Sequence, residues 1–457
     1  MVPALTKGGR GTIQVRIRTR VPRLGGAGNF FSGSGFMQSF RFVHAADLHL
    51  DAPFRGLGLD SKDMGNALSR ATFDAFADLI RLCLEKEADF LLVSGDVYNQ
   101  EKSSLRAHLA FRDGLAELAA HNICVYVVHG NHDPVGSFSR AVDWPENTHI
   151  FNSDEPESIP FSREGEILAL IHGASHMRSK ETRNLAERFV RDQREVFQIG
   201  LLHCNVGRNT GHEPYAPCDL RDLTETGLDY WALGHVHTRG VLSENPHVVY
   251  PGNIQGLNVN ETGARGCFVV DVGEKGAAEP VFHALDKFRW ACVRVDIRDI
   301  TTLDRLEEKI LGLIEAEQCE AGKRGLVCRV VLSGRGALHH YLSEDGSRDD
   351  FLQRLREQLS GFDPPVWIKD LVPDTAPEID LEARRDRRDF LGEVLSRAEE
   401  VKSREDKLEF LQKEVFFDLF GHRRAGKYLR ELDLNEAEEL LRRAELLAAD
   451  RLEPGEE

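Results

Sequence analysis

The chain has 457 residues, of which 41% are hydrophobic and 29% charged, and its formal net charge is −17. This length predicts two or three domains with a globular composition. No uncharged apolar run approaches the roughly 20 residues that cross a membrane. The acidic balance argues against a protein that coats nucleic acid non-specifically, so any such contact has to come from a local groove. Eight cysteines without a Cys-x-x-Cys pair argue against a disulfide framework or a zinc ribbon, and they fit a reducing, cytoplasmic location.

Residues 1–38 differ in composition from the rest of the chain. They carry six basic side chains and no acidic one, end in a Gly/Ser-rich stretch, and lack the continuous apolar core of a secretory signal. We expect a disordered basic extension here, or a true start at Met37.

Residues 39–285 alternate short apolar runs with amphipathic segments, which predicts an α/β domain. The first part predicts a βαβαβ unit with a parallel sheet and right-handed crossovers. Its strands are expected at 42–46, 90–93 and 124–128, and its helices at 66–87 and 103–121. Further strands are expected at 167–171, 198–202, 230–233, 247–250 and 267–271. Because fewer helices separate these later strands, we expect the second half of the domain to be more antiparallel.

Two further regions follow. Residues 286–375 predict a small α+β capping domain, with strands at 290–297, 326–332 and 366–371 and helices at 301–317 and around 349–360. Residues 376–457 are charged and helical, and Lys407–Phe420 forms an amphipathic segment ahead of Gly421. This segment packs on its own domain or docks onto a partner; the sequence leaves both open.

Five polar motifs occur in order, most of them just after a predicted strand. They are Asp47-x-His49, Gly95-Asp96, Gly130-Asn131-His132-Asp133, His203 and Gly234-His235-Val236-His237. Open α/β sheets place ligand sites beyond the carboxyl ends of their strands, so we expect the motifs to converge on one rim. A Gly-Asp turn or a single histidine is ordinary by itself, but carboxylate, amide and imidazole groups in this order suit two adjacent divalent transition ions.

Each spacing has a physical reason. An extended Asp47-x-His49 segment directs both side chains to one face, and His235 and His237 are related in the same way. A glycine before Asp96, Asn131 and His235 permits a tight turn with positive φ. We expect Asp96 to bridge two ions about 3.5–4 Å apart, which would clamp a phosphodiester and lower the pKa of a bridging water from about 15.7 towards about 7.

Six other histidines lie apart from these motifs, and we interpret them as structural or surface residues. His172 and His212, near a strand end or in the loop after His203, stay open. The six are His44, His108, His121, His129, His149 and His247.

The five motifs resemble those of the calcineurin-like metallophosphoesterase superfamily. Residues 42–50, Phe-Val-His-Ala-Ala-Asp-Leu-His-Leu, are similar to the SbcD-type DNA repair exonucleases. Segments 212–218, 230–237 and 250–256 resemble the YhaO-like branch of that family, and the resemblance is strong over about 40–290. It implies a four-layer αββα sandwich that binds two manganese ions, with iron or zinc as alternatives.

The resemblance also implies individual roles. Asp47, His49, Asp96 and His237 would hold the first ion, and Asp96, Asn131, His203 and His235 would hold the second. His132 would act on the scissile phosphate as proton donor or charge stabiliser, and Asp133 would orient His132 by a hydrogen bond. Some relatives have a second catalytic histidine where this chain has Asn99, which cannot carry a proton. Metal binding is expected to survive this difference, whereas the rate or the exonuclease mode is in question.

Three functional hypotheses follow. The first is a two-metal DNA exonuclease and endonuclease of the repair type, in which a metal-bridging hydroxide attacks phosphorus. The second is a metallophosphoesterase for a small phosphodiester, a phosphomonoester or a phosphoprotein, since the fold hosts many substrates. The third is a catalytically weak scaffold subunit of a DNA-repair ATPase complex.

The expected partners are DNA and, by resemblance, an SMC-like coiled-coil ATPase that binds the C-terminal helices; a homodimer stays open. Six basic residues in loops near the motifs are candidates for phosphate contacts: Arg55, Arg140, Arg178, Lys180, Arg208 and Arg239.

Overall fold

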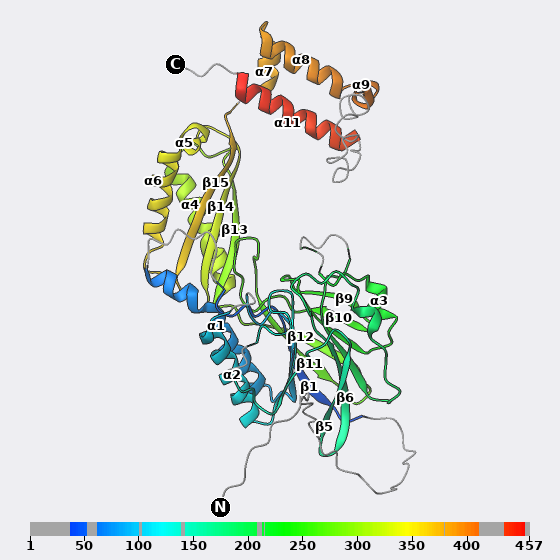
Figure 1. Ribbon diagram of the computed structural model, residues 1–457. Helices are drawn as coiled ribbons and strands as arrows, with labels where there is room; N and C mark the ends of the chain where they lie inside the picture. Colours follow the sequence, from blue (N-terminus) through cyan, green and yellow to red (C-terminus); the bar gives the residue numbers. More distant parts are fainter. Residues whose placement is uncertain are drawn as a thin grey trace, which may run out of the picture. The chain divides into compact units, whose positions relative to one another are not determined.

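The computed structural model describes residues 37–52, 62–99, 103–138, 142–207, 213, 215–378, 380–410 and 434–452. Within them, twelve strands form two six-stranded sheets, and three later strands form a sheet of their own (Figure 1). Most of the predicted basic extension lies outside the described residues. No helix in the described part of the chain combines the length and apolarity needed to cross a membrane.

The first sheet has the order β12-β11-β1-β2-β3-β4. Its strands are β1 Phe40–Ala45, β2 Phe90–Ser94, β3 Cys124–Val128, β4 Thr148–Ile150, β11 Gly266–Val272 and β12 Ala278–Ala284. Strands β1 to β4 are parallel, and β11 and β12 add antiparallel. The crossovers are α1 Lys62–Glu85 and α2 Leu105–Ala120, as the βαβαβ pattern predicts. Their apolar faces bury Phe76, Leu79 and Phe111 against one side of this sheet.

The second sheet has the order β5-β6-β7-β8-β10-β9. Its strands are β5 Glu157–Arg163, β6 Glu166–Ala174, β7 Phe197–His203, β8 Tyr230–Gly234, β9 Gly240–Glu244 and β10 His247–Tyr250. The expectation of a more antiparallel second half is wrong for its centre, because β6, β7, β8 and β10 are parallel. It is right for the edge strands β5 and β9. The crossovers are mostly irregular chain with a 3₁₀ turn, η1 Ala186–Arg188, and a short helix, α3 Leu220–Thr224. They therefore carry little helical periodicity in the sequence.

The two sheets pack face to face around an aromatic core. Phe42 and Phe90 of the first sheet stack with ring centroids 5.2 Å apart, and Phe42 meets Tyr230 of the second sheet edge-on at 5.1 Å. The outer face of the second sheet is covered by Leu185 and Phe189 together with the crossover chain. The metallophosphoesterase-type αββα architecture is thus present, with one thin outer layer.

The remaining described elements form two further groups. Strands β13 Phe288–Asp296, β14 Gly325–Arg335 and β15 Val366–Ala376 make a parallel sheet, accompanied by α4 Leu303–Ala321, α5 His339–Ser343 and α6 Asp345–Gln358. Beyond them lie α7 Leu381–Arg385, α8 Phe390–Lys402, α9 Glu405–Phe410 and α11 Leu434–Leu452. The strand and helix predictions for 286–375 match these elements in type and order. The predicted segment Lys407–Phe420 lies outside the described residues after Phe410.

Candidate metal centre

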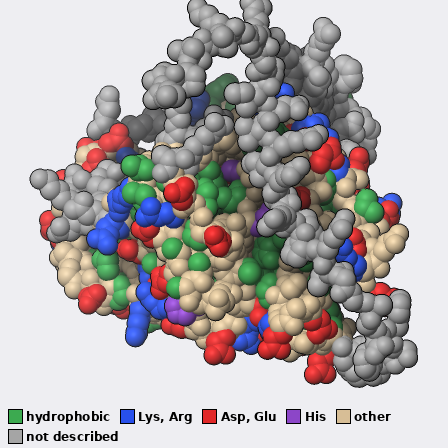
Figure 2. Space-filling model, turned by 60° about the horizontal axis from the view of Figure 1, so that its bottom comes forward, with side chains coloured by type: hydrophobic (Ala, Val, Ile, Leu, Met, Phe, Trp, Pro, Cys, Tyr) green, Lys and Arg blue, Asp and Glu red, His purple; other side chains and the backbone are tan. Residues whose placement is uncertain are grey.

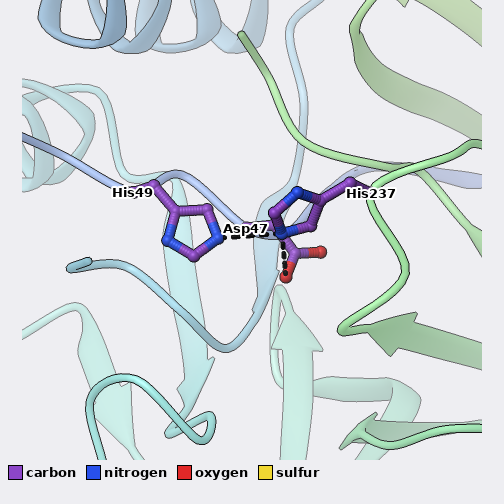
Figure 3. A group of neighbouring side chains, drawn as sticks. All are labelled: Asp47, His49 and His237. Carbon is purple, nitrogen blue, oxygen red and sulfur yellow. Dashed lines mark hydrogen bonds and ion pairs between the residues drawn. The ribbon is translucent and has the colours of Figure 1, made fainter. Parts of the chain in front are cut away.

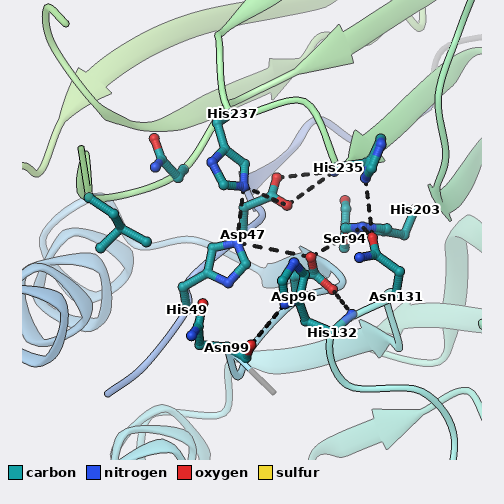
Figure 4. Close-up of polar contacts among 12 residues, drawn as sticks. Asp47, His49, Ser94, Asp96, Asn99, Asn131, His132, His203, His235 and His237 are labelled. Atoms are coloured by element: carbon teal, nitrogen blue, oxygen red, sulfur yellow. Dashed lines mark hydrogen bonds and ion pairs between the residues drawn. The ribbon is translucent and has the colours of Figure 1, made fainter. Parts of the chain in front are cut away.

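The polar motifs meet where the carboxyl ends of the two sheets come together (Figure 4). Asp47 and His49 follow β1, Asp96 follows β2, and Asn131 follows β3. His203 is the last residue of β7, and His235 and His237 follow β8. The structure therefore brings all seven predicted ligands to one rim, and all but His237 are buried.

At four of these seven residues the backbone is left-handed rather than extended. The φ angle is 51° at Asp47, 44° at His49, 50° at Asp96 and 101° at His235. The expectation of an extended Asp47-x-His49 segment is therefore wrong. Non-glycine residues seldom occupy this region, and such conformations gather at functional sites, where the surrounding structure holds them in place.

The glycines of the motifs act in two ways. Gly95 has a φ of 88°, as predicted. Gly130 and Gly234 do not have positive φ, so that part of the prediction is wrong. A Cβ at Gly130 would lie 2.1 Å from Asp96 Oδ1, and one at Gly234 would lie 1.9 Å from the Ser94 carbonyl oxygen. These two glycines are needed because another part of the site passes directly over them.

The first group of donor atoms consists of Asp47, His49, Asp96 and His237. The Nε2 atoms of His49 and His237 face each other at 3.0 Å. His237 Nε2 lies 4.0 Å from Asp47 Oδ1, and His49 Nε2 lies 3.9 Å from Asp96 Oδ2. Figure 3 shows Asp47, His49 and His237 pointing toward one another. Both carboxylate oxygens of Asp47 also accept the backbone N–H of His235 at 3.1 Å.

The second group shares Asp96 with the first. His203 Nε2 lies 3.4 Å from Asp96 Oδ2 and 3.0 Å from Asn131 Oδ1. His235 Nδ1 lies 3.2 Å from the same Asn131 oxygen. Asp96 Oδ2 therefore lies within reach of both groups, which is the placement expected of a bridging ligand.

The proton positions in the second group favour a cation. His203 Nδ1 donates to the Ser94 carbonyl at 2.8 Å, and His235 Nε2 donates to the Glu213 carbonyl at 3.0 Å. In a neutral ring the other nitrogen is then a lone-pair acceptor. Burial lowers the pKa of His203 well below its ordinary value, so this ring is neutral. With the Asn131 amide oxygen as assigned, three acceptors and a carboxylate converge, and a divalent cation satisfies all of them.

The carboxylates and imidazoles of the first group also fit a bound cation. Burial raises the pKa of Asp47 to about 7 and also raises the pKa of Asp96. Burial lowers the pKa of His49 well below its usual range, and no residue in the described part of the chain hydrogen-bonds to His49 Nδ1. Buried carboxylates are costly without a countercharge, and a metal ion provides one.

His132 and Asp133 are arranged differently from the prediction. His132 Nδ1 donates to the Asn99 carbonyl at 2.8 Å, and its backbone N–H donates to Asp96 Oδ1 at 2.9 Å. Asp133 makes no hydrogen bond to the His132 ring; its carboxylate accepts the backbone N–H groups of Gly130 at 2.9 Å and Tyr98 at 3.2 Å. Asp133 is fully buried and ties two loops of the site together, so the predicted orienting bond is wrong.

Two side chains that the sequence did not single out also shape the site. Glu261 accepts the His237 Nδ1–H at 3.1 Å. The buried His176 ring donates to the His203 carbonyl at 2.6 Å. No short motif marks either residue. By contrast, His44 bonds to Tyr230 and Ser94 inside the core, consistent with the structural role we expected.

Comparison with known proteins identifies the family. Residues 40–239 match the family described as calcineurin-like phosphoesterase, and residues 290–376 match the middle domain of metallophosphoesterase YhaO. The chain is 36% identical over 343 residues to the metallophosphoesterase YhaO of Bacillus subtilis (strain 168), covering 74% of this chain and 83% of that protein. The chain belongs to the YhaO family of calcineurin-like metallophosphoesterases. It is also 25% identical over 285 residues to the DNA double-strand break repair protein Mre11 of Thermoplasma acidophilum, covering 59% of this chain and 70% of that protein.

As a member of this family, the chain is a phosphoester hydrolase, and its donor groups open onto a pocket of about 480 Å³. Its lining residues are Asp96, Asn131, His132, Ser179, Lys180, Glu213, Tyr215, His235 and His237. Among the six basic candidates, Lys180 lines this pocket, while the Arg239 guanidinium lies over the Phe282 ring, 4.1 Å from its centroid. Arg178 is exposed and does not line the pocket. The other three, Arg55, Arg140 and Arg208, lie outside the described residues, as does His212.

Proposed function

We propose that this YhaO-family protein is a two-metal-dependent DNA nuclease that hydrolyses phosphodiester bonds, with Mn²⁺ as the preferred ion and Fe²⁺ or Zn²⁺ as alternatives. The observation that carries the proposal is the pair of donor groups that share Asp96 Oδ2 beneath an open pocket lined by His132. Such a pair suits in-line displacement at phosphorus.

Asp47, His49, Asp96 and His237 would hold one ion, and Asp96, Asn131, His203 and His235 would hold the other. When bound, two divalent ions polarise phosphoryl oxygens and lower the pKa of a coordinated water.

His132 contributes to the reaction from the protein side. Its Nδ1 is fixed by the Asn99 carbonyl, and the ring is exposed at the pocket. Because Nδ1–H is held by that carbonyl, Nε2 carries a proton when the ring is an imidazolium, and that proton is then positioned for transfer to the leaving oxygen. General acid catalysis of this kind contributes about 10²–10⁴-fold to rate. The contact uses the backbone of Asn99, so His132 is anchored whatever side chain stands at position 99.

Two observations favour DNA over a small phosphoester. Curated relatives of the chain include DNA double-strand break repair proteins, such as those of Thermoplasma acidophilum and Methanocaldococcus jannaschii. The described residues also extend well beyond the matched catalytic region, which a minimal phosphatase does not need. Acidic and basic side chains are interspersed on the described part of the face in Figure 2, so we expect DNA to be held at the pocket rather than on a broad basic surface.

The test compares substrates and variants of the full chain. With Mn²⁺, wild type should degrade linear DNA faster than it cleaves a nitrophenyl phosphodiester; the opposite preference would support the small-substrate alternative. H132A should lose DNA cleavage while keeping its bound metal. H121A is a matched control, because His121 is an exposed histidine that caps its own helix by bonding to the Glu117 carbonyl. If H132A cleaves as well as wild type, the role of His132 is refuted. A purified protein that binds no divalent metal would support the alternative of a catalytically weak scaffold subunit.

We further propose that the C-terminal helices bind an SMC-like coiled-coil ATPase. Phe390, Leu440 and Leu447 leave 70%, 39% and 52% of their surface exposed on α8 and α11. Exposed apolar side chains at helical spacing are suited to docking another helix. Co-purification with such an ATPase, lost in L440D/L447D, tests this.

A further inference from the structure

The loop between β10 and β11 holds His237 at two points. The backbone N–H of Asn253 and the guanidinium of Arg265 both donate to the His237 carbonyl oxygen. Glu261, on the same loop, accepts the ring Nδ1–H at 3.1 Å. His237 is thus fixed at both its backbone and its ring, with Nε2 directed toward His49 and Asp47.

Glu261 is itself firmly held. Its Oε2 accepts Asn253 Nδ2 at 2.7 Å and the Leu257 N–H at 2.8 Å, and its Oε1 accepts Asn258 Nδ2 at 2.6 Å as well as His237. The side chain is therefore a carboxylate, and it cannot rotate away without leaving donors unpaired.

Two of the other three ligand histidines have a neutral backbone carbonyl, and not a carboxylate, at the ring nitrogen that faces away from the donor group. They are His203 and His235, which donate to the backbone carbonyls of Ser94 and Glu213, whereas His49 Nδ1 has no hydrogen-bond partner among the described residues. A carboxylate behind an imidazole fixes its tautomer and makes the ring a stronger ligand. The Glu261 charge also lies behind the first donor group alone, where it attracts a dication.

We propose that Glu261 is a positioning residue for His237 that makes the ion at Asp47, His49 and His237 the more tightly bound of the two. The ion at Asn131, His203 and His235 is then the weaker and more readily exchanged one. This inference rests on the proposed two-metal centre and assigns an order of loading within it.

The experiment is a Mn²⁺ titration of the metal-free full chain by calorimetry, with electron paramagnetic resonance at one and at two equivalents. Wild type should show two unequal sites, with an uncoupled Mn²⁺ signal at one equivalent and a spin-coupled pair at two. E261Q should weaken the tighter site about 10–100-fold, the range for losing such a partner, and should leave the weaker site little changed. E261D, which keeps the charge, should recover part of the loss.

E157Q is a matched control, because it alters another Glu–His pair, Glu157 with His149 at 3.3 Å, away from the site. Unchanged affinities in E261Q would overturn the inference. Equal weakening of both ions in E261Q, unrelieved in E261D, would also overturn it, since Glu261 would then only support the loop. If wild type binds no Mn²⁺, the metal centre itself is refuted, and the two failures are distinguishable.

Discussion

Replacing Gly234 by alanine gives a sharp test of how the two sheets are joined at the site. The backbone at Gly234 is not left-handed, so alanine causes no conformational strain of its own. The added Cβ, however, would lie 1.9 Å from the Ser94 carbonyl oxygen and 2.9 Å from His203 Nδ1. Real Cβ atoms essentially never approach closer than 3.0 Å, so β2 and β8 would have to separate by about 1 Å here.

Overpacking of this kind destabilises proteins by about 1–3 kcal/mol. The same oxygen accepts the His203 Nδ1–H at 2.8 Å, so its displacement also turns His203 away from Asp96. We therefore expect G234A to lower the unfolding midpoint by several degrees. We also expect it to weaken the ion at Asn131, His203 and His235 while sparing the other.

Thermal unfolding and Mn²⁺ titration measure these two effects. G240A is the matched control, since Gly240 lies six residues along the chain, lacks positive φ, and has no atom of the described residues within 4 Å of its Cβ position. A G234A protein that is as stable as G240A and binds two ions normally would refute the close-approach argument.

Three other predictions concern the same rim. D133N should lower the free energy of unfolding by about 1–3 kcal/mol, because an amide nitrogen would face a backbone N–H that now donates to the carboxylate. Urea unfolding measures this loss, and an unchanged unfolding midpoint would contradict the prediction. K180A should weaken DNA binding uniformly across sequences and reduce the slope of log affinity against log salt concentration by about one. R239A should change neither the affinity nor this slope, because Arg239 covers Phe282 instead of lining the pocket. Equal effects of the two variants in a salt titration would count against this assignment. Chelation of divalent metal should lower the midpoint of thermal unfolding, and Mn²⁺ should restore it, because the ion binds only the folded protein. An unfolding midpoint that does not change with chelator would contradict the proposed metal centre.

The sequence determined the kind and order of most elements, because apolar runs and helical spacing are local properties. It also determined which residue types meet, since motifs that follow strands gather at the same edge of an α/β sheet. The strands it missed, β4, β5, β9 and β12, lie at sheet edges, where half-buried and exposed residues interrupt the apolar pattern.

Only the tertiary structure decided how those motifs work. The parallel centre of the second sheet depends on irregular crossovers with little periodicity. The roles of Gly130 and Gly234 depend on atoms of Asp96 and Ser94, which belong to other strands. The partners of Asp133 and the support of His237 by Glu261 are likewise contacts between separate loops. Local sequence fixes which groups are available, whereas hydrogen bonds and close approaches across the fold fix which of them touch.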